Sequence, residues 1–213
     1  MEKNIAWYNE TIGQKVVAAL VKNRFSAEYV SDRKAALEAT LAAIPAGSSI
    51  GFGGSVTKEE VGVTEALKQR GFNIIDWHSP GLSREAQDSA RLRAMQADVF
   101  ITGANAVTVD GQLINVDATG NRVGALGYGP GKSIVLVGVN KIVPDVEAGI
   151  KRIRTIASPI NNKRIGLPNP CATTGICVDC DSPARICNIT TIMHKRPSRS
   201  VVHIILIGEN LGY

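Results

Sequence analysis

The stretch SSIGFGGSVTKEE, residues 48 to 60, runs from a short apolar strand through a pair of glycines into a helix that begins near Thr57. Gly53 and Gly54 allow the backbone to turn sharply and to approach a ligand closely. Ser55 and the first N–H groups of the helix are then placed to bind an anion. In open α/β sheets, ligands bind at the carboxyl ends of the strands, where such turns lie. The stretch therefore predicts an α/β fold with an anion site at residues 53 to 57; a tight turn without a ligand is the alternative.

Apolar runs and helical patterns alternate on both sides of this turn. Strands are predicted at residues 72–77, 98–102, 132–139 and 201–208, and helices at about 5–24, 26–44, 58–70, from Ser83 onward and 144–156. Asp110-Gly111 between alternating flanks predicts a β-hairpin. Because continuous apolar strands separated by helices are typical of parallel sheets, we expect an α/β fold whose open sheet is mainly parallel, with helices on both faces.

A chain of 213 residues is long enough for one well-packed α/β domain, and we expect a single one. Its predicted parts are N-terminal helices over residues 1–45, a core sheet over 46–157, a cysteine-rich insertion over 158–200 and a terminal strand over 201–208. The insertion contains five prolines and no clear periodicity. Since a structureless loop of that length is rare in a compact domain, the cysteines are the candidates for holding it in place.

All four cysteines lie in CATTGICVDCDSPARIC, residues 171 to 187, with the spacing C-x5-C-x2-C-x6-C. Cys177 and Cys180 form a CxxC pair that aims two sulfurs at one point, and Cys171 and Cys187 reach that point if the loop wraps round it. Four thiolates without histidine suit an iron–sulfur cluster or a tetrahedral zinc. A single CxxC is closer to a ferredoxin run than to the two CxxC knuckles of a zinc ribbon. We therefore expect an iron–sulfur cluster of the 4Fe-4S type, with zinc as the alternative; free thiols and disulfides also stay open.

Charge and targeting signals limit the class of protein. The N-terminus has no apolar signal region, and no stretch approaches the ~18 apolar residues of a membrane span, so we expect a cytoplasmic protein. A reducing compartment favours metal or redox roles for the thiols over disulfides. Residues 151 to 200 carry a net charge of +7, which suits an anionic ligand or a solvated surface. The absence of aromatic residues among these basic ones argues against nucleic acid.

Two blocks of sequence carry a family resemblance. GFGGSVT and TGANAVTVDGQLINVDATGNRVGALGYGPGKSIVLVGVNKIV, residues 102 to 143, resemble the LUD (lactate utilisation) domain family, in its short form with a cysteine-rich C-terminal segment. The resemblance covers the chain from about residue 48 to its end. It implies a fold related to the ribose-phosphate isomerase and CoA-transferase group. It also implies a role in lactate or hydroxy-acid oxidation, together with other subunits, some of which carry iron–sulfur clusters.

A polar cluster follows the predicted hairpin. Residues 102 to 105, TGAN, stand where the related isomerases carry an acidic motif, which argues against sugar-phosphate isomerase activity. Asp117 is the remaining carboxylate nearby, in NVDATGNR. We expect Asn105, Asp117, Asn121 and Arg122 to line the ligand pocket, because such a cluster suits hydrogen bonds to a small polar molecule. A plain turn is the alternative.

Three further residues are candidates for chemistry. Glu59 and Glu60 lie one turn into the helix after the glycines, where one could act as an acid, a base or a nucleophile. His78 follows an apolar strand at an edge where ligands bind, which suits an acid–base group. Surface glutamates and an ordinary loop histidine are the alternatives.

Together these observations predict a lactate or hydroxy-acid utilisation protein. It would bind a small anionic metabolite and use a four-cysteine metal centre for electron transfer or substrate activation. Two alternatives remain: a non-redox subunit with structural zinc in an oxidation complex, and an acyl- or CoA-type transferase that uses Glu59 or Glu60. The oligomeric state stays open, a homo-oligomer included.

Overall fold

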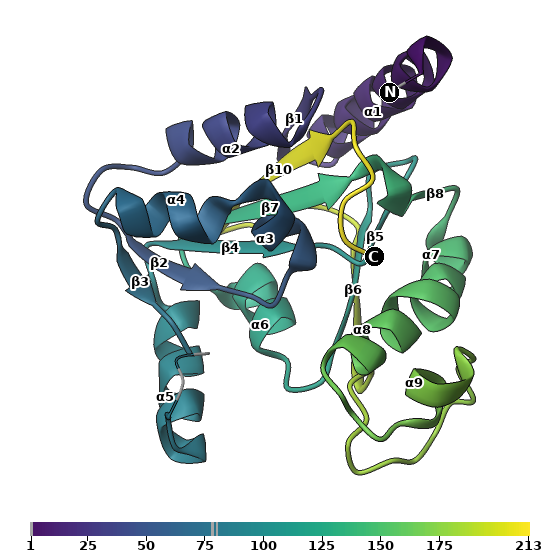
Figure 1. The fold of residues 1–213 in the computed structure, drawn as a ribbon. Coiled ribbons are helices and arrows are strands. Elements are labelled where there is room, and N and C mark those ends of the chain that lie inside the picture. The colour runs from purple at the N-terminus through teal and green to yellow at the C-terminus, as the bar shows by residue number, and fades with distance from the viewer. Residues whose placement is uncertain (1, 78, 80) are drawn as a thin grey trace.

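A six-stranded parallel sheet forms the centre of the computed structural model, which describes residues 2–77, 79 and 81–213. Its strand order is β1 (Ser26–Val30), β10 (Val201–Ile207), β7 (Lys132–Gly138), β4 (Val99–Gly103), β2 (Ser49–Phe52) and β3 (Asn73–Ile75). Every pair of neighbouring strands in it is parallel. The expected mainly parallel α/β sheet is confirmed (Figure 1).

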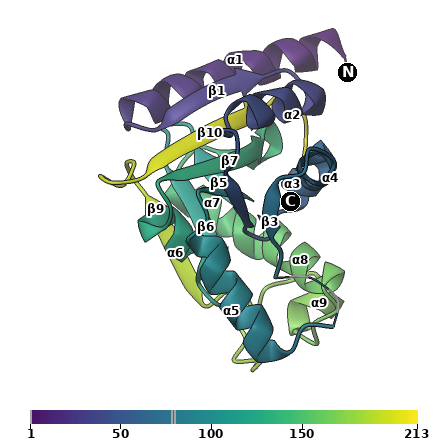
Figure 2. The same cartoon turned by 90° about the vertical axis from the view of Figure 1, so that its left-hand side faces the viewer.

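Helices cover both faces of this sheet, because alternate residues of each strand point to opposite sides. One face packs against α2 (Arg33–Ala42), α3 (Val56–Val61) and α4 (Val63–Gln69). The other face packs against α1 (Lys3–Lys22) and α6 (Asn121–Tyr128). The helix α5 (Arg84–Met95) begins where the sequence predicts it, and the hydroxyl of Ser83 caps it by accepting from the amide of Ala86. Figure 2 shows α1 running beside β1 at the outer edge of the molecule.

A second sheet of four strands lies beside the first, in the order β8 (Ile142–Val143), β5 (Ala106–Thr108), β6 (Leu113–Asp117) and β9 (Ile189–Met193). The predicted hairpin is confirmed: β5 and β6 are antiparallel, and Gly111 between them has φ +82°. A β-carbon on Gly111 would also lie 2.6 Å from the carbonyl carbon of Ala19 in α1. Glycine therefore permits both the turn and its close packing on the helix.

Two of the predicted helices differ in the structure. The expected helix over residues 26–44 is wrong for its first part, because residues 26–30 form β1 and pair with β10. Asp32 then caps α2 by accepting from the amide of Ala35. The N-terminal part of the chain thus contributes an edge strand as well as helices. The single helix expected over residues 58–70 is divided into α3 and α4 at Gly62, whose φ is +82°.

The cysteine-rich insertion has more regular structure than its sequence indicates. Helix α7 (Val146–Arg152) continues through a π turn, Ile153–Ala157, into α8 (Ser158–Arg164), and α9 (Pro170–Thr174) lies beside α8. Strand β9 then pairs with β6 and leads the chain back to the main sheet. The longest irregular stretch within this part is residues 175–188, and shorter ones lie at 165–169 and 194–200. None of the described helices is both long and apolar enough to cross a membrane.

Candidate functional site

A cavity of about 440 Å³ opens at the carboxyl ends of β2 and β4. Its walls come from the glycine turn, the residues after β4 and β6, helix α8 and the C-terminal residue Tyr213. Six of the eight residues predicted to bind a ligand line it: Gly54, Ser55, Asn105, Asp117, Asn121 and Arg122. The fold therefore brings the glycine turn and the polar cluster of residues 105–122 to one place. Gly53 and Thr57, the other two, lie outside the lining.

The glycine turn determines part of the shape of the cavity but contributes little to its electrostatic potential. A β-carbon on Gly53 would lie 2.5 Å from Oγ1 of Thr102, so Gly53 permits close packing on β4, whereas Gly54 has open space around it. The hydroxyl of Ser55 accepts from the amide of Lys58 as the cap of α3. Because α3 spans only six residues, few peptide dipoles align at its N-terminus. Any strong attraction for an anion must come from side chains.

Arg122 and Asp117 form a buried ion pair that makes one wall of the cavity. The guanidinium Nε of Arg122 donates to Oδ1 of Asp117 at 2.8 Å, and its Nη2 donates to Oδ1 of Asn105 at 2.9 Å. The second carboxylate oxygen of Asp117 accepts from the amide of Val123. The two charged side chains are only 12% and 8% exposed. These hydrogen bonds hold Asn105, Asp117 and Arg122 in one arrangement without help from a ligand.

Lys141 also lines the cavity, and the sequence-based reasoning missed it. It ends the 3₁₀ turn after β7, is 4% exposed, and donates from Nζ to Oγ1 of Thr57 at 2.8 Å. Burial lowers the pKa of Lys141 to about 7, and the neighbouring guanidiniums of Arg152 and Arg122 act in the same direction. Thr57 therefore serves the cavity indirectly, by holding Lys141. The only local signal was a lysine placed soon after an apolar strand at the ligand edge.

Basic side chains dominate the described lining. Arg91, Arg122, Lys141 and Arg164 stand against the single carboxylate of Asp117. Arg164 donates from Nε to the hydroxyl of Tyr213 at 2.5 Å, and that hydroxyl donates to Oδ1 of Asn161 at 3.1 Å. The cavity thus has a net positive charge and neutral hydrogen-bonding groups, which together suit a small anion.

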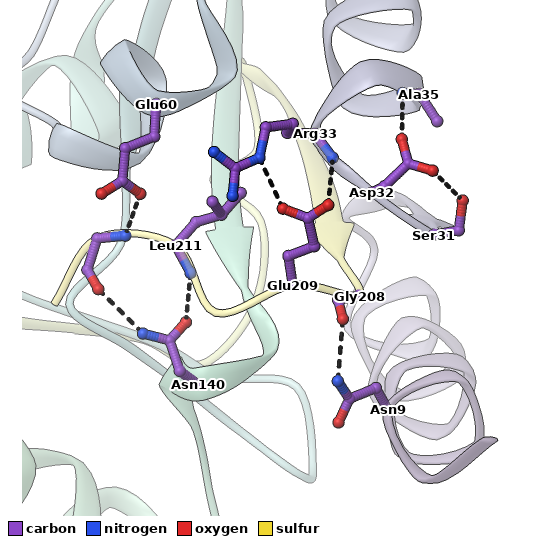
Figure 3. A network of polar contacts seen from close by, with 11 residues as sticks. Asn9, Ser31, Asp32, Arg33, Ala35, Glu60, Asn140, Gly208, Glu209 and Leu211 are labelled. Carbon is purple, nitrogen blue, oxygen red and sulfur yellow. Dashed lines mark hydrogen bonds and ion pairs between the residues drawn. The ribbon is translucent and has the colours of Figure 1, made fainter. Parts of the chain in front are cut away.

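The C-terminal residues are fixed beside this cavity by a polar network (Figure 3). Oε2 of Glu60 accepts from the amide of Gly212 at 2.7 Å. Asn140 donates to the carbonyl of Gly212 and accepts from the amide of Leu211, while Glu209 pairs with Arg33 at 2.7 Å. These contacts position Tyr213 at the cavity, and they give Glu60 a structural place.

Of the three predicted catalytic residues, the structure describes Glu59 and Glu60, and both are bonded outside the cavity. Glu60 holds the C-terminal segment, and Glu59 pairs with Nζ of Lys58 at 2.5 Å and accepts from Thr64. Neither glutamate is among the lining residues. His78 lies outside the described residues. The placement of the two glutamates gives no support to a transferase that uses one of them as its nucleophile.

The four cysteines line a second, smaller cavity, and all four are free thiols. Burial raises the pKa of the Cys171 thiol, and the charges of the other three cysteines raise it further. Arg185 donates to the carbonyls of Cys180 and Cys187. Among the residues that the structure describes, no three Cys, His or acidic side chains are close enough together to hold one metal ion. The sulfurs therefore share a cavity without forming a tight tetrahedron.

Two features of this cavity fit a bound inorganic group. Its donor set is four thiols without histidine, which is the set that iron–sulfur clusters use. Asn169 also lines it; the side-chain oxygen of this residue is buried without a hydrogen-bond partner, although its Nδ2 donates to Asn162 and Ala184. Ser158 and Ile186 line both cavities. The cysteine cavity therefore adjoins the cationic one.

Comparison with known proteins points to one family. A model of the LUD domain matches residues 13–207. Among solved structures, a DUF162 family protein from Deinococcus radiodurans is similar, with a TM-score of 0.53 and 17% sequence identity over 93% of this chain and 98% of that one. At this identity the likeness shows the fold alone. The search of curated proteins found no match.

Proposed function

The chain belongs to the LUD domain family, a family of lactate utilisation, and on that premise we propose that it acts in the oxidation of lactate or another small hydroxy acid. In this proposal the cationic cavity binds the anionic metabolite. The four cysteines hold an iron–sulfur cluster. The protein works in the cytoplasm, where its thiols stay reduced.

The main support is the adjacency of the two cavities. Ser158 and Ile186 contribute to the walls of both, so a group held by the cysteines would be separated from a bound metabolite by little more than these two side chains. Electrons pass between redox groups over such short separations. A structural metal would have no need to lie beside the ligand cavity.

The spacing of the thiols favours a cluster over zinc. A structural zinc is typically held by two CxxC pairs separated by a longer loop, whereas this chain has one CxxC pair flanked by single cysteines. An iron–sulfur cluster distributes its four cysteines over several irons, so its ligands stand further apart. Cys171, Cys177, Cys180 and Cys187 would hold it, and it would supply one-electron transfer.

The residues of this chain account for binding and orientation. Lys141, Arg122 and Arg164 provide positive charge for a carboxylate, while Asn121 and Tyr213 offer hydrogen bonds to a hydroxyl group. Oxidation of a hydroxy acid to an oxo acid releases two electrons and two protons. An iron–sulfur cluster held by the cysteines would carry one electron at a time, so both electrons would have to pass to an acceptor on another subunit and the two protons to the solvent. The proposal therefore includes partner subunits of a hydroxy-acid oxidation complex.

Anaerobic purification tests this proposal. We expect about four irons and four sulfides per chain, broad absorbance near ~400 nm that bleaches with dithionite, and binding of lactate or pyruvate but not of uncharged lactamide. The double variant Cys177→Ser/Cys180→Ser should lose iron, whereas Val178→Ser, between the same two cysteines, should keep it. Zinc without iron would replace the redox role with a structural one. Iron without any hydroxy- or oxo-acid binding would remove the metabolite from the proposal.

A further inference from the structure

Lys141 and Lys58 are two deeply buried lysines with different surroundings. Lys58 is 3% exposed, and its Nζ lies 2.5 Å from Oε1 of Glu59, 2.6 Å from Oγ1 of Thr64 and 4.0 Å from the ring centre of Phe52. These contacts offset the burial of its charge. Lys141 is 4% exposed, and among the described residues its Nζ has one hydrogen bond, to Thr57, and no ion pair. Lys141 therefore lacks the anion that Lys58 has.

The cations around Lys141 make this lack more costly. Arg152 is buried and donates to the carbonyls of Asn140 and Asn105, which carry no full charge. The other charged or titratable groups of the described cavity and its surroundings are Glu60 on α3, Arg91 on α5, Asp117 on β6, Arg122 on α6, Arg164 on α8 and Tyr213. Asp117 is bonded to Arg122, and Glu60 to the amide of Gly212. A positive charge on Lys141 would thus stand among guanidiniums without a carboxylate in contact.

The amine is nevertheless held toward the cavity. Thr57 donates its hydroxyl proton to the carbonyl of Leu211, so its oxygen faces Lys141 as an acceptor. The C-terminal segment approaches from one side at Gly212, where a β-carbon would lie 3.2 Å from Nζ. These contacts fix one N–H of Lys141. The remaining hydrogen-bonding positions of Nζ are available to the cavity that Lys141 lines.

We propose that Lys141 is the carboxylate-binding group of the cavity, and that it takes up one proton from the solvent when a small monocarboxylate binds. The neutral amine, a proton and the carboxylate combine into an ammonium–carboxylate pair, with no other bond formed or broken. The ligand class is a 2-hydroxy or 2-oxo acid, so this inference rests on the proposed function and specifies its site.

Two physical consequences follow from this coupling. The bound carboxylate supplies the counter-charge that the site lacks, so the ammonium form becomes the stable one. By linkage, an anion that favours the protonated amine loses affinity as the amine loses its proton. Since burial lowers the pKa of Lys141 to about 7, affinity for the carboxylate should fall about tenfold for each pH unit above neutrality.

The wild-type protein allows a direct test. NMR of ¹³C-labelled lysine should show the Lys141 side chain titrating near pH 7 without ligand, and at least about two units higher with saturating pyruvate. Calorimetry of pyruvate binding at about pH 8, in buffers of different ionisation enthalpy, should show uptake of nearly one proton per ligand. Lactamide should cause neither effect.

A variant and its control complete the test. Lys141→Met should weaken pyruvate binding at least tenfold and abolish proton uptake, while Lys132→Met, a partly buried lysine outside the cavity, should change neither. Pyruvate binding without proton uptake, or titration of Lys141 near pH 10 in the free protein, would overturn this inference and leave the proposed function standing. Absence of any lactate or pyruvate binding would overturn both. If Lys141→Met does not fold, the wild-type titration and calorimetry decide.

Discussion

In the cationic cavity Arg122, Asp117 and Asn105 bond to one another, whereas the cysteine cavity has four free thiols and a buried oxygen without a partner. Arg122, Asp117 and Asn105 form a closed set of hydrogen bonds. Around the cysteines, the side-chain oxygen of Asn169 is buried and unbonded, and Cys171 lies close enough to three other thiols for their charges to act on it. The first site is complete as the fold builds it. The second has bonding capacity that a bound group would use.

The backbone explains this difference. Asn105 directly precedes β5, Asp117 ends β6, and Arg122 lies in the first turn of α6, so regular elements position all three. The cysteines lie on a one-turn helix and on irregular backbone. Asp179, beside Cys180, has φ +49°, a left-handed conformation that non-glycine residues rarely adopt. Sheet positions order themselves, while such a loop gains order from what its side chains bind.

Removal of the thiols should produce the largest effect, and it should be confined to the cysteine region. If the cysteines hold the proposed cluster, the Cys177→Ser/Cys180→Ser variant loses the ligation energy that orders the loop, and hydrogen exchange in residues 170–188 should accelerate at least tenfold. Peptides from β4, β7 and β10 should keep their protection. Val178→Ser, at an exposed position between the two cysteines, is the control. Equal protection in wild type and double variant would show that the loop is ordered without its thiols.

Loss of the buried ion pair should have the next largest effect, confined to the other cavity. Arg122→Met leaves the carboxylate of Asp117 buried without its partner, which should lower the free energy of unfolding by roughly 3 to 5 kcal/mol. Urea unfolding at neutral pH measures this change. Asn121→Ala, at the adjacent cavity residue, should lower it by less than about 1 kcal/mol. Adding Asp117→Asn to Arg122→Met should restore part of the loss; no restoration would mean that the pair does not carry the effect.

Much of the fold, and part of each cavity, could be predicted from local sequence patterns. The strands β4, β7 and β10 are continuous apolar runs, and the hairpin has Asp110-Gly111 at its turn, so both could be predicted. The glycine turn and the CxxC pair are also local signals. Strand β1 was not predictable in this way, because SAEYV is half polar and becomes a strand only by pairing with β10 at the far end of the chain.

The cavity residues that were missed depend on contacts between distant segments. Glu60 could not be separated from a catalytic carboxylate until its bond to Gly212 was seen. Thr57 belongs to the anion turn by sequence, yet its hydroxyl is used inside the protein by Lys141 and Leu211. The burial of Lys141 comes from α3, α7 and the C-terminal segment meeting over it. No local sequence pattern predicts that three distant segments pack over one side chain.

Lys141 is the one charged group of this comparison that, in the described part of the chain, lacks a partner of opposite charge. Its replacement should change the free energy of unfolding least among these variants, and it should raise that free energy where the others lower it. Its pKa is lowered by burial to about 7 in the folded protein, from 10.5, so between these values the unfolded chain binds more protons. The stability of the wild-type protein should therefore rise as the pH increases through that range. At and below neutrality, the cost of burying the charged amine of Lys141 should lower this stability. Lys141→Met removes the penalty, so it should stabilise the protein at about pH 7 by roughly 1 to 3 kcal/mol and flatten the pH dependence. Urea unfolding at several pH values measures both the stability and its pH dependence, with Lys132→Met as the control. Parallel pH profiles for wild type and Lys141→Met would show that the amine stays charged in the folded protein. Lys141 would then be as well compensated in the cavity as Arg122 is.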